Sequence, residues 1–579
     1  MTDVTDATTG KRAPTPDDAL RIADSDQGGP VLAADGTPLK RSLRRALRAQ
    51  KLRALMLIAP LLIFVLVTFI APIADMLFRS VENQIVSNTL PQTTRALADW
   101  DAKGGELPGE PVFEALYYDM FLAAEAKEHT KLGTRLNYEE TGISSLFRSS
   151  GRKMDDIGED RIKALEDLDA SWEDAGFWYA LMTGGEGAEG DSGLLGDERA
   201  RMSNLVRADF GGDIGFVPGE EVSAVLPRTA RAYTDFAFYT AVVDNDVVAE
   251  EEPWEAVKLA LVEDLRSPET AAALQGYSGP GAEELRAAAT MAAEFPAMSF
   301  RDAFADLDSG WVNLDNWQTI QIYSPPLTSG YFLNSVDMQK SVDGPVMRPE
   351  NERLYVMLFQ RTLFMSLVIT ASCILLGYPV AWILANLPSR TANLLMILVL
   401  LPFWTSLLVR TSAWKVMLQQ QGVINDVLVW MGLVGDANRL VMINNQFGTI
   451  VAMTHILLPF MILPMYSVMQ TINPTYLRAA KSLGATNWTA FWRVYFPQSV
   501  PGIGAGSILV FILSIGYYIT PEIVGGTTGT FISNRIAYHI SSSLNWGLAA
   551  ALGSILLVVV LALYWAYDKI VGIDNVKLG

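Results

Sequence analysis

The chain has 579 residues, half of them hydrophobic, and long apolar runs in a chain with this many charges point to a membrane protein with a soluble part. The formal net charge of −19 is unevenly spread: residues 80–355 hold 50 acidic and 22 basic residues, and the remainder holds 13 and 22. The single cysteine, Cys373, excludes an internal disulfide and a cysteine metal site, and three histidines speak against a histidine metal cluster.

The first 50 residues are polar and rich in Asp, Pro, Gly and Thr. They lack the early apolar core that marks a cleaved signal peptide. We therefore expect residues 1–50 to form a disordered cytoplasmic tail, with transmembrane helix 1 following within residues 51–79.

Six apolar segments are long enough to cross a bilayer, which needs about 20 helical residues. One lies near the start of the chain, and the other five lie close together in residues 356–579. The pattern predicts an all-α polytopic membrane protein with six transmembrane helices. The segments cover residues 54–74, 362–385, 393–412, 448–470, 502–521 and 548–567.

Basic residues set the predicted orientation. Seven Lys and Arg residues between positions 40 and 53 precede the first span, which places that side in the cytoplasm. Six spans return the C-terminus to the same side, and the loops that carry Arg390 and Arg493 are then cytoplasmic as well. Both termini are therefore expected in the cytoplasm, and residues 80–355 outside it.

This acidic insert, residues 80–355, is predicted to be mostly helical. The spacing of Ala, Leu, acidic and aromatic residues predicts helices over 112–127, 227–243, 254–265 and 282–295. No internal repeat is apparent along the chain. Four aromatic residues before the second span are typical of a belt at the membrane interface: Trp311, Trp317, Tyr323 and Tyr331.

The segment 474–497, between the fourth and fifth spans, is the most informative part of the sequence. Asn473-Pro474 is a helix start signal. Gly484 permits a bend between two short helices, because glycine adopts backbone conformations that other residues resist. Pro497 and Pro501 are expected to end the helical pattern before the fifth span.

The same segment resembles the EAA loop of binding-protein-dependent transport permeases, whose motif reads E-A-A, three residues, G, nine residues, I-x-L-P. Ala479-Ala480, Gly484 and the closing Val494, Phe496 and Pro497 match it. In that family the loop forms a coupling helix that docks on the ATPase subunit. The resemblance implies coupling roles for Arg478, Ala479, Ala480, Lys481, Gly484 and Pro497.

One residue departs from the motif. Arg478 stands where the family has glutamate, so a basic contact replaces the acidic contact to the ATPase. An ordinary amphipathic loop, in which Arg478 and Lys481 face lipid, is the alternative interpretation of the segment.

Within the family the chain is most similar to the spermidine/putrescine branch, which also includes opine transporters. The resemblance covers residues 52–82 and 310–579, and the insert between them has no counterpart in a typical branch member. It rests on the segments LLPFWTSLLVRTSAW (400–414), LPFMILP (458–464), ITPEIVGG (519–526) and NWGL (545–548).

The resemblance implies the six-helix permease fold of ABC importers in the bacterial inner membrane. The helical extracytoplasmic domain between helices 1 and 2 is predicted from the residues of the insert and not from the resemblance. The implied partners are a cytoplasmic ABC ATPase dimer, a second permease subunit of different sequence, a periplasmic substrate-binding protein and membrane lipid, but no nucleic acid. The sequence contains no G-x-x-x-x-G-K-[ST] phosphate loop. We therefore expect a transport subunit rather than an enzyme, with no bound cofactor, whose partner uses the ATP.

Glu522, at the outer end of the predicted fifth span, is the first candidate for the substrate pathway, because an ionisable group near membrane depth is costly and often functional. A carboxylate at the aqueous edge without a ligand is an equal alternative. Tyr517 and Tyr518 could contact a cation through their ring faces, and with Gly516 they stand where the polyamine branch has G-D-F. Trp404 completes the candidates.

The predicted function is a permease subunit for a small solute, a polyamine, delivered by a binding protein. An opine or another small organic solute is the alternative substrate. A stand-alone secondary transporter is an alternative of another class, but it would carry inverted repeats or several intramembrane charges. A signalling receptor would need a sizeable cytoplasmic output domain, which the sequence does not offer.

Overall fold

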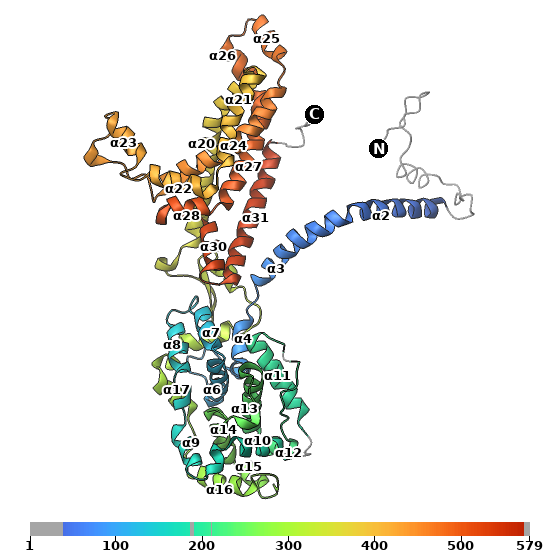
Figure 1. Cartoon of the computed structure of the whole chain (residues 1–579), viewed down its shortest axis with the longest axis vertical. Coiled ribbons are helices and arrows are strands. Elements are labelled where there is room, and N and C mark those ends of the chain that lie inside the picture. The colour runs from blue at the N-terminus through green and yellow to red at the C-terminus, as the bar shows by residue number, and fades with distance from the viewer. Residues whose placement is uncertain (1–38, 186–189, 210, 572–579) are drawn as a thin grey trace. The chain divides into compact units, whose positions relative to one another are not determined.

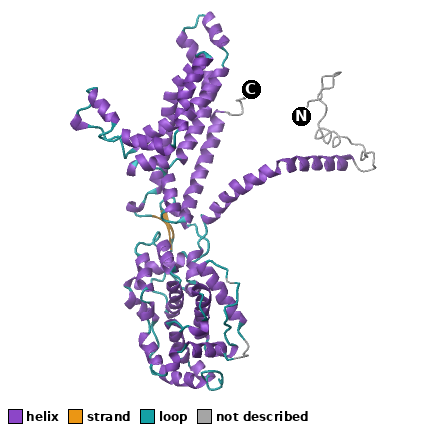
Figure 2. Ribbon diagram, in the orientation of Figure 1, coloured by secondary structure: helices purple, strands orange, loops and turns teal. Residues whose placement is uncertain are grey.

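The computed structural model describes residues 39–185, 190–209 and 211–571, and nearly all of its regular structure is helical (Figures 1 and 2). The chain divides into two units, Met1–Phe78 and Arg79–Gly579. In the first unit, α2 (Leu39–Val65), a π turn (Leu66–Ile70) and α3 (Ala71–Arg79) follow one another. The segment Leu55–Arg79 is long and apolar enough to cross a bilayer.

Part of the predicted N-terminal tail is helical. Residues 39–50, which the sequence assigns to a disordered tail, belong to α2. Leu, Ala, Lys and Arg, which are good helix formers, fill this stretch, so the helix of the first span extends toward the N-terminus. The rest of the predicted tail lies outside the described residues.

The insert, between α3 and α20, consists of short helices and one hairpin. The predicted helices at 112–127, 227–243, 254–265 and 282–295 correspond to α6, α13, α14 and α16. In the hairpin, β1 (Met338–Ser341) pairs antiparallel with β2 (Gly344–Met347), with Met338 opposite Met347. The helices are α4 (Gln84–Thr89), α5 (Pro91–Ala96), α6 (Glu110–Glu125), α7 (Glu128–Leu136), α8 (Ile143–Gly151), α9 (Glu159–Glu166), α10 (Ala175–Thr183), α11 (Ser192–Val206), α12 (Glu220–Val225), α13 (Pro227–Tyr239), α14 (Glu255–Leu265), α15 (Pro268–Ala273), α16 (Ala282–Ala292), α17 (Phe300–Leu307), α18 (Leu314–Ile322) and α19 (Gly330–Asn334).

The aromatic residues expected at the membrane interface are buried instead. Trp311 and Trp317 have no exposed surface, and Tyr323 and Tyr331 are 1% and 6% exposed. The ring of Trp317 lies edge-on against that of Phe113, with 4.8 Å between the ring centroids. Large rings are needed to fill the space between short helices, and each removes much apolar area from water. The interface prediction is therefore wrong.

The membrane domain starts at α20. The described residues contain five helices that are long and apolar enough to cross a bilayer, or six if one bent pair is counted as a single span. Three of them, α20, α24 and α27, pack against one another. The elements are α20 (Tyr355–Asn386), α21 (Ser389–Leu400), α22 (Leu407–Met417), α23 (Val423–Trp430), α24 (Gln446–Thr471), α25 (Pro474–Ser482), α26 (Asn487–Ala490), α27 (Phe496–Gly516), α28 (Ile519–Val524), α29 (Gly526–Gly529), α30 (Ile532–Ser541) and α31 (Trp546–Val571).

Two of the predicted spans differ from straight helices over the expected residues. The third, at 393–412, is bent by 92° between Trp404 and Leu407, where α21 and its terminal 3₁₀ turn meet α22. Pro402 in that turn lacks the amide hydrogen that would continue an α-helix.

The fifth span begins before the prolines that were expected to precede it. One helix runs from Asn487 to Gly516 and passes through Pro497 and Pro501. A π turn, Phe491–Tyr495, lies directly before Pro497, and the Phe496 amide donates to the Phe491 carbonyl. The wider turn rearranges the hydrogen bonds at the place where a proline cannot donate one, so the prediction of a helix end there is wrong.

A single carboxylate joins the insert to the start of α20. Asp337 Oδ1 accepts hydrogen bonds from the amides of Leu354 and Tyr355, at 2.9 and 2.8 Å, and Oδ2 accepts one from Val356 at 2.9 Å. A carboxylate at a helix N-terminus satisfies amides that have no partner within the helix and interacts favourably with the helix dipole. Asp337 thereby fixes the end of the insert to the first turn of a membrane helix.

Candidate coupling surface and substrate pathway

The predicted coupling segment, residues 474–497, forms two short helices separated by a turn. Asn473 Oδ1 accepts a hydrogen bond from the Thr475 amide at 2.9 Å, and Pro474 occupies the first turn of α25, where no amide donor is needed. Gly484 has a φ of +90°, and a Cβ there would meet nothing within 4 Å. The backbone conformation and not the available space therefore requires glycine, and the predicted bend is confirmed.

The surface of this segment is exposed and positively charged. The residues 474–497 include no Asp or Glu, and their three charged residues are Arg478, Lys481 and Arg493, all exposed. Leu483 and Trp488 are 89% and 72% exposed. Large apolar side chains at the tip of a basic surface are typical of a site that another protein covers.

The base of the segment packs on a membrane helix through aromatic rings. Tyr378 of α20 lies 6.2 Å from the ring of Phe491 and 5.8 Å from that of Phe496, between centroids. Its hydroxyl is 3.0 Å from Ser499 Oγ. In the sequence, the only mark of Tyr378 is its place beside Pro379 in an apolar span. Through these contacts a movement of α25 and α26 would reach α20.

Three of the four pathway candidates lie together. Asn534 of α30 donates from Nδ2 to Glu522 Oε2 at 2.6 Å and to the Tyr518 carbonyl at 2.9 Å. Ser533 Oγ donates to the Tyr517 carbonyl at 2.9 Å. These bonds hold the chain just after α27 against α30 and leave Glu522 exposed. The fourth candidate, Trp404, is 70% exposed and lies on a different element, in the turn at the bend of the third span.

The coupling segment and the Glu522 group lie at opposite ends of α24. At the start of α24, the Asn444 amide donates to the Val524 carbonyl at 2.9 Å, and Thr449 Oγ1 donates to the Gly529 carbonyl at 3.1 Å. The helix α25 begins three residues after the last residue of α24. Because α24 has 26 residues and a helix rises 1.5 Å per residue, the two groups are separated by roughly 39 Å along it, which is more than the thickness of the hydrocarbon core.

Comparisons with known proteins find relatives of the membrane domain. Residues 377–571 match the family model described as binding-protein-dependent transport system inner membrane component. The spermidine/putrescine transport system permease protein PotB of Escherichia coli is 34% identical over 220 residues, which cover 38% of this chain and 79% of that protein. The inner membrane ABC transporter permease protein YdcU of Escherichia coli is 32% identical over 222 residues, or 37% of this chain and 70% of that protein.

A crystal structure of a bacterial ABC transporter that imports alginate aligns with 38% of this chain and 80% of that chain, at 22% identity and a TM-score of 0.32. The sequence relatives, and not this alignment, carry the assignment. Members of the family work with a partner ATPase, which uses the ATP, and with a periplasmic binding protein. The chain belongs to the family of binding-protein-dependent transport system inner membrane components, as the permease subunit of an ABC importer and not as an enzyme.

Proposed function

We propose that this chain forms one half of the translocation pathway for a polyamine and couples it to an ABC ATPase through residues 474–497. The observation that carries the coupling role is the exposed turn at Gly484, flanked by Arg478, Lys481 and Leu483, on the helix end remote from Glu522. The second permease subunit of the importer is a different chain, as in the polyamine branch that the sequence resembles.

The proposed orientation places both termini and residues 474–497 in the cytoplasm, and the insert and Glu522 outside. Two observations support it. Basic residues crowd the N-terminal side of the first span. The insert meets α20 at its first residue, while Tyr378, near the other end of α20, contacts the coupling segment. The insert and the coupling segment thus lie toward opposite ends of one membrane helix.

The basic charge of the coupling surface indicates which charges its partner should carry. With Arg478 in the place of the family's glutamate, residues 474–497 carry three positive charges and none that is negative. We propose that the recess of the cognate ATPase is acidic around Arg478 and Lys481 and apolar where it receives Leu483. Charge complementarity of this kind selects partners more than it raises affinity.

The polyamine assignment is supported by the PotB relatives and by the exposed Glu522, which shares its hydrogen-bond donor Asn534 with the Tyr518 carbonyl. A carboxylate and aromatic faces are the groups that attract an ammonium ion. Sealed vesicles containing the whole importer should take up spermidine or putrescine when ATP and the binding protein are supplied. Uptake of an opine or another anionic solute, with none of either polyamine, would overturn the substrate assignment.

The coupling assignment is tested separately. Purification of the tagged chain in mild detergent should recover an ABC ATPase, and Gly484→Asn should retain it, because asparagine tolerates positive φ better than other residues do. Recovery of no ATPase with the unmodified chain would contradict the coupling role, whatever the substrate.

A further inference from the structure

Two parts of the insert share a sequence pattern. Residues 86–96 and 222–232 both read Val-Ser-x-x-Leu-Pro-x-Thr-x-Arg-Ala. Further along each part, residues 164–178 and 303–317 share Ala, then Asp-Leu-Asp, then two tryptophans in identical spacing. The prediction that the chain has no internal repeat is therefore wrong.

The same hydrogen bonds recur at the matching positions. Asp119 Oδ2 accepts from the amide and Oγ1 of Thr93, at 2.7 and 2.8 Å. Asp264 Oδ2 accepts from the amide and Oγ1 of Thr229, at 2.9 and 2.8 Å. In each case an aspartate in a long helix, α6 or α14, fixes the first turn of a helix that starts with Leu-Pro, α5 or α13.

The paired tryptophans repeat in the same way. Trp178 Nε1 donates to the Trp172 carbonyl at 2.9 Å, and Trp317 Nε1 donates to the Trp311 carbonyl at 2.8 Å. Each pair follows a helix, α9 or α17, and each spans a 3₁₀ turn and the start of the next helix, α10 or α18. The elements α4–α10 thus correspond in order to α12–α18.

The two hydrophobic cores of the insert are each built from both copies. One core joins Val86, Leu90 and Leu146 of the first copy to Trp311 and Trp317 of the second. The other core joins the tryptophans of the first copy, Trp172 and Trp178, to Val222, Leu226 and Leu285 of the second.

Two isolated β-bridges also join the start of one copy to the end of the other. Glu82, before the first copy, pairs with Leu327 after the second, and Gly190, after the first copy, pairs with Gly219 before the second. Each copy therefore starts beside the end of the other.

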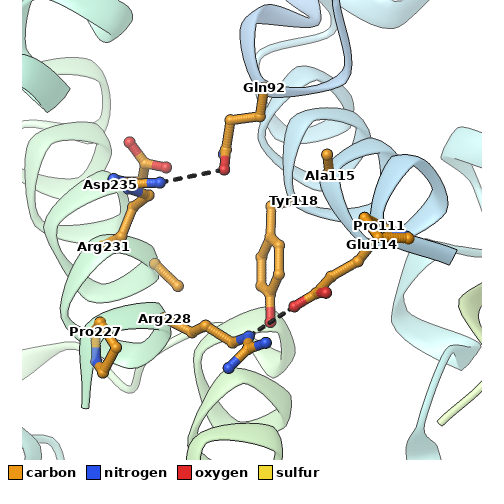
Figure 3. A pocket seen from close by; sticks show the side chains of 10 residues that line it. Gln92, Pro111, Glu114, Ala115, Tyr118, Pro227, Arg228, Arg231 and Asp235 are labelled. Carbon is orange, nitrogen blue, oxygen red and sulfur yellow. Dashed lines mark hydrogen bonds and ion pairs between the residues drawn. The ribbon is translucent and has the colours of Figure 1, made fainter. Parts of the chain in front are cut away.

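A cavity of about 250 Å³ lies where the copies face each other (Figure 3). Gln92 and Arg228, which occupy matching positions in the two copies, both line it. Its polar groups pair across the copies: Arg228 Nε donates to Glu114 Oε1 at 2.6 Å, and Arg231 Nη1 donates to Gln92 Oε1 at 3.5 Å. The cavity belongs to the contact between the copies.

We infer that the insert is a tandem duplication of one helical module, seen as α4–α10 and again as α12–α18, whose two copies exchange their C-terminal halves. It follows that neither copy has a complete core without the other, and that the insert folds as one obligate unit. The arrangement also accounts for the buried indole nitrogen of Trp172, which is unpaired within the described part of the chain.

The Trp172 indole nitrogen is buried and has no hydrogen-bond partner among the described residues. Its counterpart in the second copy, Trp311 Nε1, donates to Ser150 Oγ of the first copy at 2.8 Å. In the alignment that matches Trp172 with Trp311, the residue that matches Ser150 is Ala289, which packs at the edge of the core that contains Trp172. The Trp172 indole therefore lacks a hydrogen-bond acceptor among these residues because the second copy has Ala289 where the first has Ser150.

The two copies have also taken different roles at the membrane. In the first copy, the Tyr138 ring lies 6.2 Å from that of His539 in α30, and Glu139 Oε2 accepts from Arg348 Nη2 at 3.2 Å. The matching residues of the second copy, Tyr277 and Ser278, make neither of these contacts within the described residues. In Figure 1, α7 and α8 lie at the end of the insert toward the membrane helices, and α15 and α16 lie at its other end. Among the described residues, the first copy contacts the membrane domain through Tyr138.

Hydrogen exchange measured by mass spectrometry on the full chain in lipid nanodiscs tests the exchange of halves. Trp317→Phe should speed exchange in α6 and α8 of the first copy, and Trp178→Phe should speed it in α14 and α16 of the second. If each substitution loosened the early helices of its own copy instead, the exchange of halves would be refuted.

A repair of the missing bond tests the duplication itself. Ala289→Ser should slow amide exchange in α10 and α16 by about fivefold, the effect of one added buried hydrogen bond. Ala287→Ser, at an exposed site of the same helix, controls for the lower helix propensity of serine. The gain should vanish in the Trp172→Phe background, because the indole donor is then absent. A gain that is absent, or that survives in that background, would overturn the equivalence of Ser150 and Ala289.

Discussion

Residues 474–497 differ in charge pairing from the cluster of Arg135, Tyr138, Glu139, Arg348 and His539, here called the anchor, where the insert contacts the membrane domain. Residues 474–497 expose three basic side chains with no acid among them. At the anchor, Arg135 and Arg348 are 8% and 10% exposed and both pair with Glu139, which is 4% exposed. Burying a charge is costly unless it is paired, so the anchor must satisfy its charges within the chain, whereas the coupling segment can leave them for a partner.

We interpret the anchor as a permanent contact and residues 474–497 as a surface for a transient one. The anchor adds further links to its ion pairs, since Arg135 Nε donates to the Tyr331 hydroxyl at 2.8 Å and Asn334 Nδ2 donates to Glu139 at 3.1 and 3.2 Å. A network of this kind has one arrangement and resists movement. We therefore expect substitutions at the anchor to lower stability, and substitutions in the coupling segment to lower transport without unfolding the chain.

The largest effect is expected at Gly484. Gly484→Pro forces φ to about −65° where the turn requires +90°, so α25 and α26 cannot keep their relative direction. Transport by the reconstituted importer should fall by at least about tenfold, while insertion into the membrane and the melting temperature stay unchanged. Gly484→Asn, the matched control, should keep much of the activity. Normal transport by the proline variant would remove the basis for the coupling mechanism.

A comparable substitution at the anchor should act on stability instead. Glu139→Ala leaves Arg135 and Arg348 buried without their shared carboxylate, which we expect to cost about 3–5 kcal/mol in the free energy of unfolding. Thermal unfolding followed by circular dichroism in nanodiscs measures the loss. Glu159→Ala, which removes an exposed partner of Lys163, should change nothing measurable. Equal effects of the two variants would contradict the view of Glu139 as a structural anchor.

Reversal of one exposed charge sharpens the comparison further. Arg478→Glu should weaken stimulation of the cognate ATPase by about tenfold at low salt, since like charges across the interface are unfavourable, and the fold should be unaffected. The defect should shrink as salt is raised, because screening weakens the repulsion. Arg390→Glu, also exposed but outside residues 474–497, is the control. An Arg478→Glu variant that stimulated hydrolysis better than the native chain would show that the recess is basic.

The smallest effect is a dependence of the anchor on pH. Burial, and to a lesser extent Arg535, lowers the pKa of His539 to about 4, while its neutral ring lies 3.0 Å from the Tyr355 hydroxyl and 2.8 Å from Ser543 Oγ. The unfolded chain then binds a proton more readily than the folded one, so the contribution of this site is complete above about pH 6.5 and is lost as pH falls toward 4.

Hydrogen exchange in α30 between pH 7 and pH 4 reports this loss, after correction for the intrinsic rate. The His539→Asn variant should remove the pH dependence while keeping a polar side chain in place. A dependence that persists in the variant would assign the titration to another group.

Local patterns in the sequence predicted the parts of the fold that depend on neighbouring residues. The turn at Gly484 and the start of α25 at Asn473-Pro474 follow from backbone conformation and capping, which involve residues a few positions apart. The apolar lengths of the spans are equally local. The pathway candidates Glu522, Tyr517 and Tyr518 were found in the same way, but their link through Asn534 was not, because it joins two separate helices.

The aromatic residues before the second span show where such reasoning fails. Trp311 and Trp317 have the composition and the position of a membrane-interface belt, yet they fill a protein core that includes Leu90 and Leu146, which lie far earlier in the chain. Nothing within reach of a hydropathy window distinguishes the two environments.

The sequence by itself determined that the chain is a helical membrane protein and that an acidic segment interrupts it, and it showed the resemblance of residues 474–497 to a coupling motif. Only the tertiary structure decided that the third span is bent, that the fifth runs through its prolines, and that the two copies in the insert exchange their halves. The physical reason is range: helix formation and bilayer insertion are settled by nearby residues, whereas burial and pairing depend on which distant segment supplies the other side of the contact.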